Sequence, residues 1–81
     1  MNNINTSSRE SEENLLGILT KREKQVFEML IKNKSTRDIA KSLNISEKTI
    51  RNHISNVMQK LGVKGRTQAV IELLKLGELT L

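Results

Sequence analysis

The segment from Ser46 to Leu61, SEKTIRNHISNVMQKL, concentrates side chains whose chemistry suits binding to nucleic acid. Arg51 carries a forked guanidinium, Asn52 follows it with an amide, and no acidic residue occurs after Glu47 in this segment. In the major groove of DNA, a guanidinium pairs with the edge of guanine and an amide with the edge of adenine. The segment can therefore recognise base pairs if its polar side chains share one face of a helix.

A helix over residues 46–61 would sort these side chains into separate faces. At about 100° per residue, the polar groups gather on one side, which contains Lys48, Arg51, Asn52, Ser55 and Gln59. The opposite arc is apolar and has to face a core; its members are Ile50, Ile54, Val57, Met58 and Leu61. Between them lie Thr49, His53, Asn56 and Lys60. The projection predicts an outward face suited to DNA, although a solvated basic helix would show the same pattern.

Capping signals predict two helices before this segment. Thr20 and Glu23 form a T-x-x-E capping box, which opens a first helix over about residues 21–33. Ser35 and Asp38 repeat this logic and open a short second helix. The apolar positions predicted to form the core of these two helices are Val26, Phe27, Leu30, Ile39, Ala40 and Leu43.

The remaining signals complete an all-α fold of four helices. Ser46 can cap the third helix, which ends where Gly62 permits a left-handed turn, and a fourth helix runs over about residues 66–76 before Gly77. No stretch alternates apolar and polar residues at period two, so no strand is predicted. A short helix, a tight turn and a longer helix with a polar face form the helix-turn-helix arrangement of DNA-binding proteins.

The composition limits the possible classes of function. The chain has 81 residues, no cysteine and a single histidine, His53. A domain of this size has little room for an enclosed catalytic pocket, and no constellation of nucleophile, base or metal ligands is visible. We therefore predict neither an enzyme nor a metal or cofactor site. The formal net charge of +5 favours a polyanionic partner.

The beginning of the chain differs from the rest. Residues 1–14 are rich in Asn, Ser and Glu and are predicted to be a disordered tail, whereas residues 15–81 form the predicted domain. The tail lacks the apolar core of a signal peptide, and no apolar run is long enough to span a membrane. We expect a cytoplasmic protein that associates with the nucleoid.

Four motifs resemble those of a known family. LTKRE, DIAKSL, ISEKTIRNHISN and MQKLGVKGRTQAVIELLKLGEL together are similar to the LuxR-type (NarL/FixJ) DNA-binding domain, over about residues 19–81. The resemblance implies a transcription regulator that places its third helix in the major groove of double-stranded promoter DNA. The chain also resembles the small stand-alone regulators of late spore-coat genes. This resemblance implies a role in sporulation, and it implies that RNA polymerase is a further partner.

The resemblance also implies roles for individual residues. The positions that face the groove in such domains correspond here to Lys48, Arg51, Asn52 and Ser55, the same residues that the helical projection places outward. The positions that approach DNA phosphates correspond to Ser35, Thr36, Ser46, Thr49, His53 and Lys60. Lys34 stands where many relatives have glycine, at the end of the first helix.

The fourth helix has more apolar residues than a single core contact requires. They cover an arc of about 220°, wider than the usual stripe. Ala69, Val70 and Leu73 are predicted to serve the core, which leaves Ile71 and Leu74, with Leu79 and Leu81 nearby. Because LuxR-type domains resemble one another in pairing through this helix, Ile71 and Leu74 are predicted to form a homodimer interface. The alternative is a C-terminal segment that folds back over its own domain.

Other functions remain as alternatives at this point. Most relatives attach such a domain to a receiver or ligand-binding module, so the chain could be the detached effector domain of a response regulator. If the domain acts alone, we expect its activity to be set by how much of the protein is made, rather than by phosphorylation or a small ligand.

Two other binding functions are also alternatives. A helix-turn-helix adaptor that binds protein would be expected to carry an acidic or apolar third helix, and an RNA-binding module would need aromatic platforms. The single aromatic residue, Phe27, is predicted to lie in the core.

Overall fold

The computed structural model describes residues 17–81, which form four α-helices and contain no strand. In chain order these are α2 (Lys21–Leu30), α3 (Thr36–Leu43), α4 (Glu47–Leu61) and α5 (Arg66–Lys75). The all-α prediction is confirmed. The tail predicted at residues 1–14 lies outside the described residues. Within residues 17–81, no helix combines the length and the apolar character that crossing a membrane requires.

The three predicted side-chain caps are present. At the start of α2, the Glu23 amide donates to Thr20 Oγ1 at 3.1 Å, and the Thr20 amide donates to Glu23 Oε1 at 2.9 Å. The hydroxyl of Ser35 accepts from the Asp38 amide at the start of α3. The hydroxyl of Ser46 likewise caps α4, whereas α5 follows Gly65 without a side-chain cap. Each cap satisfies a backbone donor that has no partner within its own helix.

Helices α2 and α5 end slightly earlier than the sequence predicts, whereas α4 ends at the predicted position. Helix α2 ends at Leu30 instead of near Asn33, because the next residues form a tighter turn in which the Asn33 amide donates to the Leu30 carbonyl. Asn33 then adopts a left-handed backbone with φ of 65°. Asparagine tolerates this conformation better than most residues. Gly62 ends α4 as predicted, with φ of 69°.

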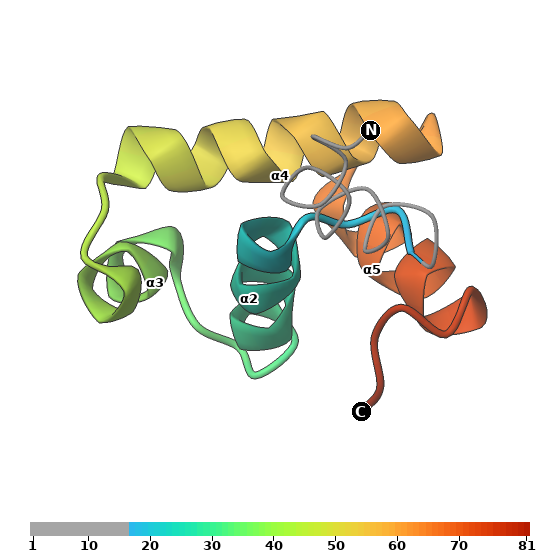
Figure 1. The fold of residues 1–81 in the computed structure, drawn as a ribbon, viewed down its shortest axis with the longest axis horizontal. Coiled ribbons are helices and arrows are strands. Elements are labelled where there is room, and N and C mark those ends of the chain that lie inside the picture. Colours follow the sequence, from blue (N-terminus) through green and yellow to red (C-terminus); the bar gives the residue numbers. More distant parts are fainter. Residues whose placement is uncertain (1–16) are drawn as a thin grey trace, which may run out of the picture.

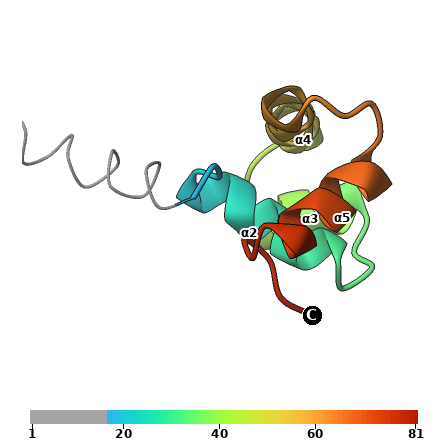
Figure 2. The same cartoon turned by 90° about the vertical axis from the view of Figure 1, so that its right-hand side faces the viewer.

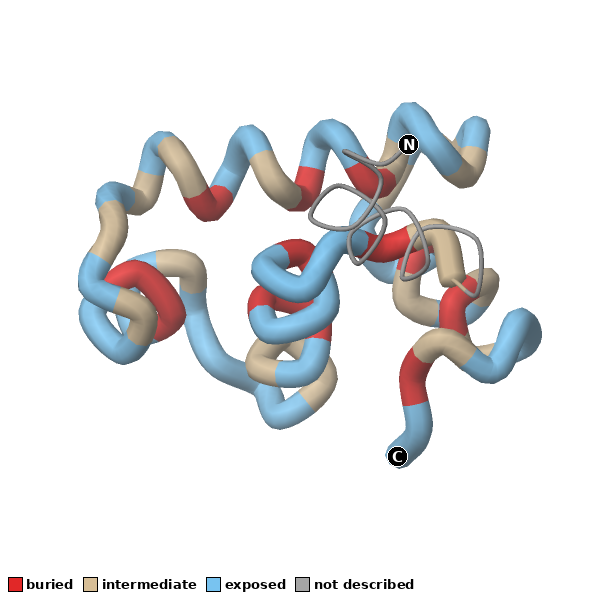
Figure 3. Tube along the Cα trace, viewed as in Figure 1, coloured by how far each residue is buried: buried red, intermediate tan, exposed pale blue. Residues whose placement is uncertain are grey.

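One long helix lies across the other three. In Figure 1, α4 runs along the top of the domain, with α3, α2 and α5 beneath it, and Figure 2 shows α4 end-on with the other helices on one side of it. Figure 3 shows that the buried positions of α4 face these helices while the opposite side is exposed. The arrangement buries one stripe of α4 and leaves its other side open to solvent.

The core contains most of the predicted apolar residues. Val26, Phe27, Ile39, Ala40, Ile50, Ile54, Val57, Ala69 and Leu73 are buried. Leu30, Leu43, Met58, Leu61 and Val70 are partly buried and pack against them. Leu79 is also buried, so the prediction that it remained available outside the core is wrong. The chain turns back after Gly77, and the Leu79 amide donates to the Leu73 carbonyl at 3.3 Å, which brings the Leu79 side chain inward.

Candidate DNA-binding helix

The outward face of α4 carries the predicted base-reading residues together. Lys48, Arg51, Asn52 and Ser55 are all exposed. Figure 3 shows that the exposed positions of α4 lie mainly on the side that faces away from the other helices. Gln59 extends the same exposed surface toward the end of the helix. We call Lys48, Arg51, Asn52, Ser55 and Gln59 the outward face. A convex helix with donors along one side has the shape and chemistry that the major groove admits.

The turn before α4 fixes how this helix is presented. Asn44 ends α3 in the left-handed conformation, with φ of 59°. The Ile45 amide donates to the Ala40 carbonyl at 3.0 Å, which closes the turn. Ser46 then caps α4, so only a few residues separate the two helices. Helices α3 and α4 therefore form a helix-turn-helix unit in which α3 braces the longer helix.

The predicted phosphate-contacting hydroxyls lie at two helix N-termini. Ser46 and Thr49 are in the first turn of α4, and their hydroxyl oxygens lie 2.9 Å apart. Ser35 caps α3 as Ser46 caps α4, and Thr36 is the first residue of α3. Both sites combine hydroxyl groups with the positive end of a helix dipole, which favours an anion such as phosphate. His53 is half-buried beside the apolar side of α4.

Lys60 has partners inside the protein. Its ammonium donates to Glu23 Oε1 at 2.5 Å and to the Ile18 carbonyl at 3.1 Å. The Glu23 side chain is only 5% exposed, whereas that of Lys60 is 36% exposed. The carboxylate that closes the capping box of α2 therefore also binds the last turn of α4. A lysine engaged in this way is less available to a DNA phosphate than the sequence prediction assumed.

Glu47 lies beside the outward face of α4, and no role was predicted for it from the sequence. Its Oε1 accepts a hydrogen bond from Arg51 Nη1 at 3.1 Å, and both side chains are substantially exposed. The spacing of four residues on one helix was the available signal, because such residues lie one turn apart on the same side. An acidic group thus contacts the arginine that is predicted to read bases.

The two residues predicted for a dimer interface differ in exposure. Ile71 on α5 is 47% exposed, while Leu74 is partly buried and packs against the core. Leu76, which follows α5, is 56% exposed and was not assigned to the interface. Of the two predicted residues, Ile71 therefore offers the larger apolar surface to a partner.

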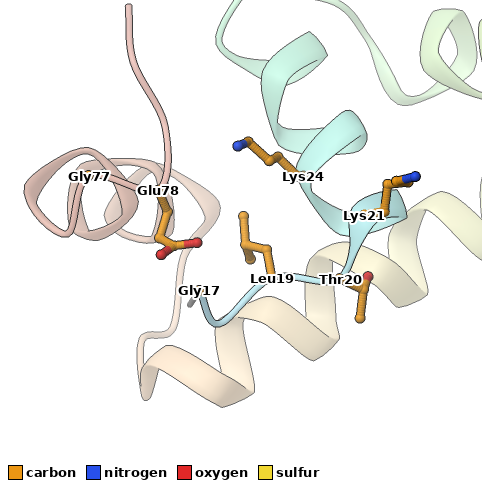
Figure 4. Close-up of a pocket in the computed structure, with 7 residues that line it drawn as sticks. All are labelled: Gly17, Leu19, Thr20, Lys21, Lys24, Gly77 and Glu78. Atoms are coloured by element: carbon orange, nitrogen blue, oxygen red, sulfur yellow. The ribbon is translucent and has the colours of Figure 1, made fainter. Parts of the chain in front are cut away.

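A shallow hollow lies away from the outward face of α4. It is bordered by the segment before α2 and the turn after α5, with Gly17 and Leu19 on one side and Glu78 on another (Figure 4). Lys21 and Lys24 from the first turn of α2 complete its rim. Among residues 17–81, no group of three or more metal-ligating side chains comes together, here or elsewhere.

The helix-turn-helix unit and the polar, exposed side of its longer helix define a DNA-binding regulator. The family model described as "Bacterial regulatory proteins, luxR family" matches residues 17–73. The chain belongs to this family and is a GerE-like transcription regulator. Members of the family are described as bacterial regulatory proteins.

Individual relatives agree with this assignment. Over 64 residues, the chain is 69% identical to the spore germination protein GerE of Bacillus subtilis, covering 79% of this chain and 86% of that protein. It is 50% identical over 62 residues to the transcriptional regulatory protein DegU of Brevibacillus brevis, covering 76% of this chain but 26% of DegU. A solved structure of the transcription factor GerE superposes with a TM-score of 0.77 at 59% identity, covering 79% of this chain and 96% of that one.

Proposed function

We propose that the protein regulates transcription by placing α4 in the major groove of double-stranded promoter DNA and recognising a specific sequence there. The observation that carries this proposal is the exposed outward face of α4, which presents a guanidinium, two amides, an amine and a hydroxyl on one side of a braced helix. A basic chain with a formal net charge of +5 also supports attraction to DNA.

Within this surface, Arg51 and Asn52 are proposed to read bases directly. Arginine pairs with two acceptors of guanine and asparagine with a donor and an acceptor of adenine, so both give geometric discrimination. Lys48 and Ser55 lie beside them on the same face. Contacts to phosphates are proposed for Ser35, Thr36, Ser46, Thr49 and His53. Lys60 is left out of this set because Glu23 already binds its ammonium.

The genes under control are proposed to belong to sporulation, including late spore-coat genes. This proposal is supported by the 69% identity to a spore germination protein over most of both chains. A regulator of such genes acts on the chromosome, which places it in the cytoplasm at the nucleoid. It also brings the protein next to RNA polymerase, which we propose as a further partner.

Two copies are proposed to bind together through α5. The exposed Ile71 supplies an apolar surface, and a twofold dimer would present two α4 helices to two half-sites. A protein-binding adaptor is not favoured, because the outward face of α4 has neither the acidic nor the apolar character that such a role would be expected to show.

Selection from a library of random-sequence duplexes tests the proposal. The wild-type protein should enrich a defined sequence, and titration should show tighter binding to that sequence than to a random duplex. Arg51→Ala should then reduce the preference by about 1–3 kcal/mol, the range for a good bidentate base contact. Lys48→Ala provides a comparison on the same face. Failure to enrich any sequence would reject sequence-specific recognition, and full preference in Arg51→Ala would reject the assigned base reader.

A further inference from the structure

Glu47 is the one acidic residue within α4, and it lies beside the proposed base readers. Four residues correspond to about 40° around a helix beyond one full turn, so Glu47 borders the outward face on the side of Arg51. Its carboxylate accepts from Arg51 Nη1 at 3.1 Å. An anion at this position would approach the phosphates and base acceptors of any bound duplex.

The contact with Glu47 leaves the Nε and Nη2 edge of the Arg51 guanidinium available to bind a base. Glu47 binds Nη1, while Nε and Nη2 lie together on the other edge and can donate side by side. Within residues 17–81, Nε and Nη2 have no hydrogen-bond acceptor, so this edge can meet the O6 and N7 acceptors of guanine. The ion pair can therefore persist while Arg51 contacts a base, and it restricts where the guanidinium points.

The Glu47–Arg51 ion pair should weaken binding to DNA that lacks the recognised sequence. Binding to random duplex depends mainly on cations that neutralise phosphates and release counterions. An arginine held by a carboxylate contributes little net positive charge to this process, and the carboxylate itself is repelled. On a matched site, the guanine contact offsets this repulsion, because it uses donors that Glu47 does not occupy.

We propose that Glu47 is a specificity-determining residue, which positions Arg51 toward guanine and opposes binding to DNA that lacks the matching base. This inference rests on the proposed function of α4 and extends it to a residue that touches Arg51. Glu47 also lies in the first turn of α4, where an acid stabilises the helix through its dipole. That effect alone would change stability without changing the preference between two DNA sequences.

The test compares Glu47→Gln with Glu28→Gln, which removes the same charge from an exposed position on α2. Each variant is titrated at several salt concentrations against the duplex selected by the wild type and against a random duplex. Glu47→Gln should bind random duplex roughly threefold more tightly, as expected from removing one exposed charge interaction. Its preference for the selected duplex should fall by a similar factor or more, and Glu28→Gln should keep the wild-type preference.

A second comparison shows whether Glu47 acts through Arg51. Glu47→Gln is also made in an Arg51→Ala background. Without Arg51, the substitution should change the ratio of affinities for the two duplexes less than it does in the wild type. Thermal unfolding of all variants should show that each is folded at the assay temperature. If Glu47→Gln bound both duplexes more tightly by the same factor, as expected for a general change in net charge, the proposed role of Glu47 would be overturned. Sequence recognition by α4 would not be affected by that result. If the wild type selects no duplex, the proposed function fails and this inference fails with it.

Discussion

Lys60 and Glu23 are 37 residues apart in the sequence, yet their side chains bind each other at 2.5 Å and join the end of α4 to the beginning of α2. Glu23 Oε1 accepts from both the Lys60 ammonium and the Thr20 amide. One nearly buried carboxylate thus serves a helix cap and a tertiary ion pair. This connection helps to hold the last turn of α4 against the body of the domain.

Replacing Lys60 should therefore affect stability more than DNA binding. Lys60→Met keeps the aliphatic stem but leaves the nearly buried Glu23 carboxylate with the Thr20 amide and without its cation, and removing one partner of a buried polar group costs about 1–3 kcal/mol. We expect the free energy of unfolding, measured by urea denaturation, to fall by this amount. Lys24→Met, at an exposed position on α2, is the matched control and should change stability little. Unchanged stability together with weaker binding to every duplex would instead identify Lys60 as a phosphate contact.

The turn between α3 and α4 should depend on the residue at position 44. Asn44 has φ of 59°, a conformation that most residues with a Cβ adopt only at a cost. Asn44→Ala should lower the free energy of unfolding by about 1 kcal/mol, and Asn44→Gly should be tolerated better because glycine adopts this backbone freely. Thermal or urea unfolding of the two variants measures the difference. If both variants lost the same stability, the left-handed backbone would not be the limiting feature of the turn.

Assembly should depend on Ile71 more cleanly than on Leu74. Ile71→Glu places like charges across the proposed twofold axis and, because the side chain is 47% exposed, should leave the fold intact. Sedimentation should then show monomers under conditions in which the wild type is dimeric, with circular dichroism unchanged. Leu74→Glu is expected to destabilise the domain itself, since Leu74 packs against the core.

Leu76→Glu is the control for this experiment. Leu76 is 56% exposed, and it lies about 140° around the helix from Ile71 at 100° per residue. The variant should therefore retain the wild-type sedimentation behaviour. A wild type that stays monomeric at high concentration would reject the α5 interface, and dissociation by Leu76→Glu alone would move the interface to another side of the helix.

Local features of this protein could be predicted from the sequence, because their determinants lie within a few residues of one another. Thr20, Ser35 and Ser46 each cap a helix through the amide three residues later, so spacing alone identifies the starts of α2, α3 and α4. The apolar stripe of α4 likewise follows from the helical period, and it determines that Lys48, Arg51, Asn52 and Ser55 point outward.

Tertiary structure decided the features whose partners are distant in the chain. Lys60 lies beside the apolar arc in a helical projection, but only the packing of α2 against α4 brings Glu23 to its ammonium. Leu79 follows α5 without a periodic pattern, and it is buried because the chain turns back after Gly77. In both cases the local sequence pattern does not determine which part of the protein the side chain contacts. The choice depends on which distant element lies within reach after the core has formed.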